Sequence, residues 1–452
     1  MRGRTLWAMG IVLAVVHCAF GQVGDSPEKI GPPKITAPTD GPVLPMDVAR
    51  SPARFYVGAD YLLWWVNHGP SPVLLTTAPN NGNGNGALTG GKLDDPTTIV
   101  LFTGRDIDYR GFSGLRAWIG FEASPDGFWS LEAGGFYLSP RSVNYSAAGN
   151  ADGSPLLTTP FLDAATGRQS SLDINSQDNL GNPYIIGSIA IHSDIKVWGY
   201  EANAIAHSIR TSERSVDLLF GYRHLRMIEN LTINQVVTAA QDGNFTIQSP
   251  TVGQGQNSYF DAIAGSPVFI SDYFGTRNYF HGGQAGARFS WDFGQLTAEL
   301  AGKVAFGVTH QQVTINGSTT TPAATDLKIP KIVGPLNTSG GVFTTVSNIG
   351  SYSQNQFTVV PEINFSLKYA VARWMNVQLG YTGLYWSNVV RPGAQIDSTI
   401  NTKLVPTGAF LPTLQVPDGS FRSDREQARP VFNFRDTAFW AHGINIGVEF
   451  RY

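Results

Sequence analysis

The segment "WAHGINIGVEFRY", residues 440–452, decides the fold because it alternates between two kinds of side chain. Large apolar residues occupy one face: Trp440, Ile444, Ile446, Val448, Phe450 and Tyr452. Small or polar residues occupy the other: Ala441, Gly443, Asn445, Gly447, Glu449 and Arg451. At about 3.3 Å per residue and a tilt of about 40°, such a strand rises about 30 Å. The segment therefore predicts a strand that crosses a membrane with its apolar face toward lipid.

Nine further segments repeat this alternation, so we predict ten strands: 54–66, 111–122, 128–138, 196–209, 214–227, 278–292, 295–314, 356–371, 374–388 and 440–452. The connections between them alternate between long and short without exception, beginning with 67–110 and 123–127. Short periplasmic turns and long extracellular loops are typical of outer-membrane barrels. The sequence thus predicts an all-β, antiparallel, up-and-down transmembrane barrel. Strand-like pieces in two loops, "NLTINQVVTAA" and "SPVFISDYF", leave twelve strands as the alternative.

Composition agrees with an exported β protein. Hydrophobic residues make up 42% of the 452 residues and charged residues only 14%, which argues against a disordered chain. The net charge of −3 and the lack of a basic run give no reason to expect a nucleic-acid partner. The 50 glycines and 12% aromatics fit many short alternating strands.

The N-terminus predicts three parts of the chain. Residues 1–21 read as a signal peptide, with Arg2 and Arg4 before a short apolar stretch and small residues before Gln22. Residues 22–53 form a proline-rich periplasmic linker, and 54–452 form the barrel. The one cysteine, Cys18, lies in the signal peptide, so we expect neither disulfides nor thiol chemistry.

The first strand contains "ADYLLWW", residues 59–65, which places Asp60, Leu62 and Trp64 on the inner face. Bulky apolar residues inside the barrel argue against a wide channel. Asp60 needs a basic partner, for which Arg116 and Arg451 on the neighbouring strands are the candidates. Trp65, Trp440 and Tyr452 are expected at the two membrane interfaces.

Charges of both signs are expected to face the lumen. By parity they are Asp60, Arg116, Glu122, Glu132, Glu201, Asp217, Arg223, Arg288, Asp292, Glu299, Lys303, Glu362, Lys368, Glu449 and Arg451. These residues either form a network that fills the barrel or line an ion-selective constriction. A ten-stranded barrel is about 20 Å across at the backbone, which favours filling.

Eight segments resemble one known family: "ADYLLWW", "PVLLTTAP" (72–79), "PTTIVLFTG" (96–104), "GFWSLEAGGFYL" (127–138), "DYFGTRNYFHGGQAGARFSW" (272–291), "GKVAFGVTHQQVTINGST" (302–319), "VVPEINFSLKY" (359–369) and "LGYTGLYWSNVVRPGAQID" (379–397). The chain resembles the putative beta-barrel porin-7 family of planctomycete-type bacteria. That family usually has Glu where this chain has Asp60. The resemblance implies an outer-membrane β-barrel of uncharacterised function and no particular substrate.

No motif for catalysis, cofactor binding or metal binding is visible in the sequence. The seven histidines after Cys18 show no Ser-His-Asp pairing along the chain, and there is no HExxH motif. We therefore expect no enzyme and no cofactor. In "RPGAQID", Arg391 and Asp397 flank the turn residues Pro392 and Gly393, and the two could pin the last long loop across the barrel mouth.

These observations predict a porin-like outer-membrane barrel with a narrow or largely plugged lumen that passes small solutes or ions. A structural or adhesive envelope barrel that acts through its surface loops is the first alternative, and an outer-membrane hydrolase or acyltransferase is the second. The expected partners are outer-membrane lipid and, during biogenesis, the barrel-assembly machinery. The sequence leaves the oligomeric state open.

Overall fold

The computed structural model describes residues 55–79, 90–124, 127–249, 258–326, 331–407 and 428–452. The expected signal peptide and linker lie outside these residues. None of the helices that it describes is long and apolar enough to cross a membrane.

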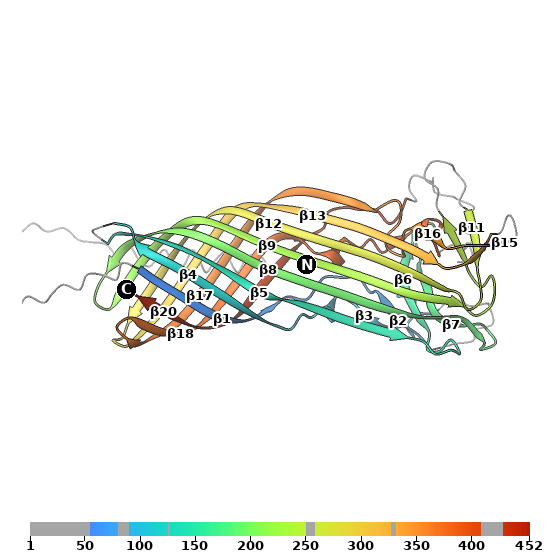
Figure 1. Cartoon of the computed structure of the whole chain (residues 1–452), viewed down its shortest axis with the longest axis horizontal. Coiled ribbons are helices and arrows are strands. Elements are labelled where there is room, and N and C mark those ends of the chain that lie inside the picture. The colour runs from blue at the N-terminus through green and yellow to red at the C-terminus, as the bar shows by residue number, and fades with distance from the viewer. Residues whose placement is uncertain (1–54, 80–89, 125–126, 250–257, 327–330, 408–427) are drawn as a thin grey trace, which may run out of the picture. The chain divides into compact units, whose positions relative to one another are not determined.

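Ten long strands close into one ring (Figure 1). They are β1 (Phe55–Val66), β4 (Gly111–Glu122), β5 (Trp129–Ala148), β8 (Pro183–Arg210), β9 (Arg214–Ala239), β12 (Pro267–Asp292), β13 (Leu296–Thr321), β17 (Gly350–Ala372), β18 (Met375–Val390) and β20 (Asp436–Arg451). Each pairs antiparallel with its neighbours, and β1 closes the ring against β20 from Tyr56↔Arg451 to Val66↔Ala441. The prediction of ten strands is therefore confirmed, and the alternative of twelve is not.

The short connections gather at one end of the barrel, here called the turn end, and the long ones at the other, called the loop end (Figure 1). One short turn joins β12 to β13, where Gly294 has a φ of +86°, a conformation that favours glycine. Asp292 Oδ1 accepts a hydrogen bond of 2.9 Å from the Gly294 N–H. The prediction that Asp292 faces the lumen is therefore wrong, because this side chain caps an exposed turn.

The strands extend further at the loop end than the sequence predicted. β8 begins at Pro183 rather than at residue 196, and β9 ends at Ala239 rather than at 227. The reason is visible in β9, where Leu231 and Ile233 face inward and are buried while the residues between and beside them are polar. In this part of β9 the apolar face is the inner one, so the pattern of outward apolar residues on which the prediction rested ends.

Loop segments add smaller sheets at the loop end. β2 (Leu75–Thr77), β3 (Ile99–Phe102), β6 (Leu157–Asp163) and β7 (Gln169–Gln177) pair in the order β3-β2-β6-β7 and join β8 through β7. β16 (Leu336–Ser339) pairs with β13, and β19 (Thr399–Ile400) pairs with β6. A separate sheet contains β10 (Thr246–Ser249), β11 (Ser258–Ala262), β14 (Ala324–Asp326) and β15 (Lys331–Val333). The 3-10 helices are η1 (Gly104–Asp106), η2 (Pro392–Gln395) and η3 (Thr402–Leu404).

Candidate functional site: a filled barrel lumen

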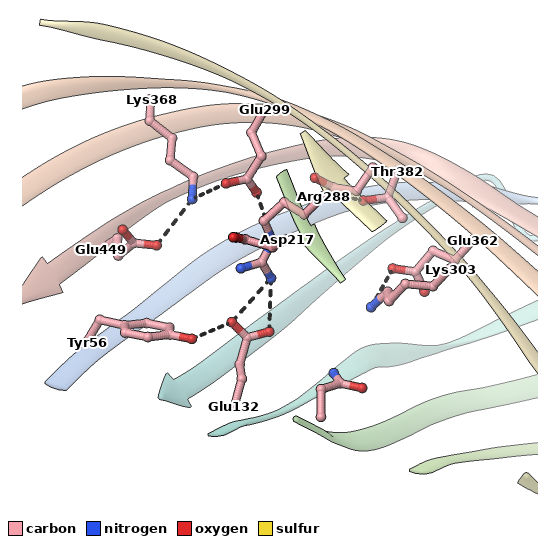
Figure 2. Close-up of polar contacts among 12 residues, drawn as sticks. Tyr56, Glu132, Asp217, Arg288, Glu299, Lys303, Glu362, Lys368, Thr382 and Glu449 are labelled. Carbon is pink, nitrogen blue, oxygen red and sulfur yellow. Dashed lines mark hydrogen bonds and ion pairs between the residues drawn. The ribbon is translucent and has the colours of Figure 1, made fainter. Parts of the chain in front are cut away.

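A first group of charges surrounds Glu362 inside the barrel, and Figure 2 shows Glu362 beside Lys303. Glu362 accepts a short hydrogen bond from Arg223 and lies 3.6 Å from Lys303 Nζ and 3.7 Å from Arg116 Nη2. Glu201 shares two of these cations, at 2.5 Å from Lys303 and 4.0 Å from Arg223. The carboxylates and cations come from five strands, β4, β8, β9, β13 and β17, so this group ties the barrel walls together across the lumen.

A second group lies nearer the turn end (Figure 2). Arg288 contacts Glu132 at 3.2 Å and Glu299 at 3.7 Å. Lys368 bridges Glu299 and Glu449 at 3.1 and 3.3 Å. All five residues were predicted to face the lumen, and the structure brings them together as a connected network.

Asp60 does not find the partner that the sequence suggested. Arg116 lies opposite Asp60 in the register of β1 and β4, but its guanidinium lies 3.7 Å from Glu362. Arg451 instead pairs with Glu449 at 2.8 Å. Asp60 accepts a hydrogen bond from the side chain of Gln378. Direct pairing with either arginine was therefore a wrong prediction, because each arginine pairs with a glutamate instead, Arg116 with Glu362 and Arg451 with Glu449.

The remaining predicted charges lie near the turn end, apart from these two groups. Glu122 lies 3.9 Å from Arg210 at the rim. Asp217 accepts from His207 Nδ1 at 2.7 Å, and His207 Nε2 lies 2.8 Å from Ser130 Oγ. No local motif in the sequence marks this Ser-His-Asp chain, because its members lie on β5, β8 and β9. Ser130 is buried, with 2% of its surface exposed.

Packed apolar and aromatic side chains follow the charges toward the loop end. Trp64 and Trp386 are fully buried, and Leu62 lies beside them in the same core. Each indole N–H is satisfied, by Asn445 Oδ1 at 2.8 Å and by Thr309 Oγ1 at 3.0 Å. We call the buried residues Leu62, Trp64, Phe112, Phe136, Phe280, Trp386 and Phe439 the aromatic layer. The prediction that Leu62 and Trp64 pack inside the barrel is confirmed.

A buried ion pair locks two long loops to the barrel wall. Arg391, 0% exposed, donates from Nε and Nη2 to both oxygens of Glu229 on β9, at 2.8 and 2.7 Å. Its Nη1 donates to the backbone carbonyls of Asn67 (3.3 Å) and His68 (2.7 Å). Tyr109 also donates to Glu229, at 2.8 Å. Burial raises the pKa of Tyr109, so its hydroxyl stays protonated as a donor.

The sequence suggested that Arg391 and Asp397 together pin the last long loop, but the structure gives the two residues different roles. Pro392 and Gly393 form η2, and a side chain at Gly393 would collide with the carbonyl oxygen of Pro70. Asp397 does not pair with Arg391. It accepts instead from Arg429 at 2.8 Å, within the same loop. Arg391 therefore pins this loop to the barrel, as the sequence suggested, and Asp397 organises the loop internally.

Another loop is held by a buried carboxylate that the sequence did not single out. Asp272 on β12 accepts backbone N–H groups of Val342, Phe343 and Thr344 at 2.8 to 3.0 Å. It also accepts from the Thr344 hydroxyl at 2.6 Å. Burial raises the pKa of Asp272 to about 6, and these four donors oppose the shift. The segment "GGVFTT" thus folds around one side chain of the wall.

The outer face of the barrel carries an exposed apolar belt. Phe220, Ile363, Leu379 and Ile446 each leave more than half of their surface uncovered. A belt of this extent marks a surface that meets lipid rather than water. Trp65 and Trp440 flank His442 on this face at centroid distances of 6.1 and 5.2 Å, as expected at one interface, and Tyr452 is exposed at the other end.

The described residues contain no group of three or more His, Cys, Asp or Glu side chains that could hold a metal ion. Several of the carboxylates instead form ion pairs with lysine or arginine side chains.

The chain is similar to the outer membrane protease OmpT from Escherichia coli, with 8% identity, a TM-score of 0.33, and coverage of 89% of this chain and 98% of that one. It is also similar to a Pseudomonas aeruginosa FadL homologue, with 7% identity, a TM-score of 0.21 and coverage of 89% and 90%. These likenesses carry no argument about activity. No curated protein matches. The family model described as putative beta barrel porin-7 matches residues 56–452, and the chain therefore belongs to that family of outer-membrane β-barrels.

Proposed function

We propose that the protein is a plugged outer-membrane barrel that acts through the ordered structure at its extracellular end. The observation that carries this proposal is the aromatic layer, in which Trp64 and Trp386 are fully buried inside the barrel. The charge groups toward the periplasm and the Arg391–Glu229 pair toward the outside add further barriers in series. Passage of small solutes or ions requires all of these to move.

The extracellular half supports the same proposal. Its inner surface is apolar, and residues from the long loops, including Phe102, Tyr109 and Phe343, are buried in one core with it. Ordering these loops costs conformational entropy, and the burial of apolar side chains offsets that cost. Loops held in this way suit a fixed recognition surface better than a flexible gate.

Planar-bilayer recording tests the plug directly. We expect the native protein to show no conductance steps under conditions where an open general porin conducts. The double substitution Trp64→Ala and Trp386→Ala removes the two largest side chains of the aromatic layer and should raise the ion leak above the native level. Steady conductance by native protein, inserted and resistant to SDS until heated, would contradict the proposal.

The Ser130-His207-Asp217 chain favours the hydrolase alternative, because its two hydrogen bonds have the connectivity of a nucleophile, a base and an orienting carboxylate. We nevertheless propose that the protein is not an enzyme, since the covered Ser130 cannot meet an acyl group. The expected result is no labelling of the folded barrel by a fluorophosphonate probe, alongside a serine hydrolase that labels in the same detergent. Labelling that Ser130→Ala abolishes would establish the enzyme instead.

A further inference from the structure

Three cations on the outer face of the barrel have no acidic partner in the part of the chain that the structure describes. Lys196 on β8, Arg226 on β9 and Arg277 on β12 take part in none of the ion pairs formed among the described residues. By contrast, cations inside the lumen, such as Arg223 and Lys303, contact carboxylates. We call Lys196, Arg226 and Arg277 the cationic patch.

The register brings the cationic patch together around one apolar residue. Lys196 and Arg277 both lie opposite Ile228, on its two sides. Neighbouring strands are about 4.8 Å apart, so the two backbones are separated by about 10 Å. Arg226 lies two residues from Ile228 on the same strand and the same face. The long side chains of all three residues can therefore reach one group placed over Ile228.

Aromatic rings hold Arg226 in position. Its guanidinium lies 5.8 Å from the ring centroid of Trp198 and 4.9 Å from that of Tyr279, its partners in register. Its Nε is buried without a hydrogen-bond partner. Because the Arg226 side chain is already held in place and has an unsatisfied donor, it loses little further conformational entropy when an anion binds.

The patch lies at the depth of lipid headgroups. The row below it contains Tyr200, His224 and His281, whose rings contact one another at 4.9 and 4.4 Å between centroids. Apolar residues such as Phe220 follow below that row, so the aromatic row marks the outer interface. The nearest carboxylate along β8, Asp194, accepts from Asn230 at 3.1 and 3.2 Å and lies 3.8 Å from His192 Nε2.

From these observations we propose that the cationic patch binds the phosphate of a lipid headgroup in the outer leaflet. Charge complementarity selects the partner, since three neighbouring cations next to a low-dielectric layer are stabilised by an anion and the leaflet presents phosphates at that depth. The lipid tails would lie along the apolar belt beneath. This inference does not depend on whether the lumen conducts.

Native mass spectrometry of the full chain in neutral detergent tests this site. The probes are phosphatidic acid and phosphatidylcholine with the same acyl chains. We expect the first phosphatidic acid to bind at least about tenfold more tightly than phosphatidylcholine, because the net negative headgroup is attracted by all three cations, whereas choline carries a positive charge of its own. The substitutions Lys196→Gln, Arg226→Gln and Arg277→Gln together should abolish that preference.

The matched control removes three exposed cations elsewhere, with Arg105→Gln, Arg168→Gln and Arg373→Gln, and should keep the preference. Heat-dependent mobility in SDS gels verifies that each variant is folded. Equal affinity of the native protein for the two lipids, or an equal loss in the control, would overturn the proposal. Displacement of the bound lipid by millimolar inorganic phosphate would also overturn it, since the site would then recognise free phosphate.

Discussion

Replacing Arg391 by alanine is expected to lower the local stability of the extracellular half by about 3–5 kcal/mol. The substitution leaves Glu229, 1% exposed, as a buried carboxylate without a cation. Burying an unpaired charge is more costly than the net gain from the original pair. It also releases the carbonyls of Asn67 and His68, so that two loops lose their shared anchor.

Hydrogen–deuterium exchange measures this effect where it occurs. The amides of η1 and η2 should lose protection by about a hundredfold or more, while those of β1 and β20 keep theirs. Arg168→Ala, which removes an exposed arginine from another long loop, is the control and should change exchange little. Unchanged protection of η2 in the Arg391→Ala protein would show that the ion pair does not hold the loops.

The second large effect is expected for Glu362→Gln in the lumen. The substitution keeps the side-chain shape but removes the charge that Arg223, Lys303 and Arg116 share. Glu201 alone then faces the first two cations. We expect the free energy of unfolding to fall by about 3–5 kcal/mol, the cost typical of breaking a buried pair from one side.

Urea titration of the barrel in lipid vesicles, followed by tryptophan fluorescence, measures this loss. Glu213→Gln is the control, because Glu213 is exposed in the turn between β8 and β9 and should shift the midpoint little. Adding Arg223→Gln to Glu362→Gln should recover part of the lost stability, since the double variant removes both members of the pair. A midpoint unchanged in Glu362→Gln would mean that water already screens the network.

The two substitutions probe different functions of the buried charges. Those around Glu362 connect barrel walls within the membrane, whereas Glu229 connects the wall to the loops. If the barrel acts through its extracellular surface, loss of the Arg391 pair alters that surface and leaves the membrane part folded.

Sequence alternation predicted the ten strands and most of the lumen-facing charges because lipid imposes an apolar outer face. The periplasmic ends of the strands were accurate for the same reason. At the extracellular end the prediction stopped near residue 227 of β9, although pairing continues to Ala239. There the outer face meets water and the inner face packs on loops, so outward polarity no longer distinguishes a strand from a loop.

The sequence by itself determined the membrane strands, their directions and the inward position of Leu62, Trp64 and the charges, since each follows from a period of two against lipid. Only the tertiary structure decided the partners. Arg391 pairs with Glu229, 162 positions away, and Asp60 with Gln378, 318 positions away. Closing the barrel brings side chains from distant strands into one small volume, and the choice among neighbouring charges depends on three-dimensional distances that no local pattern contains.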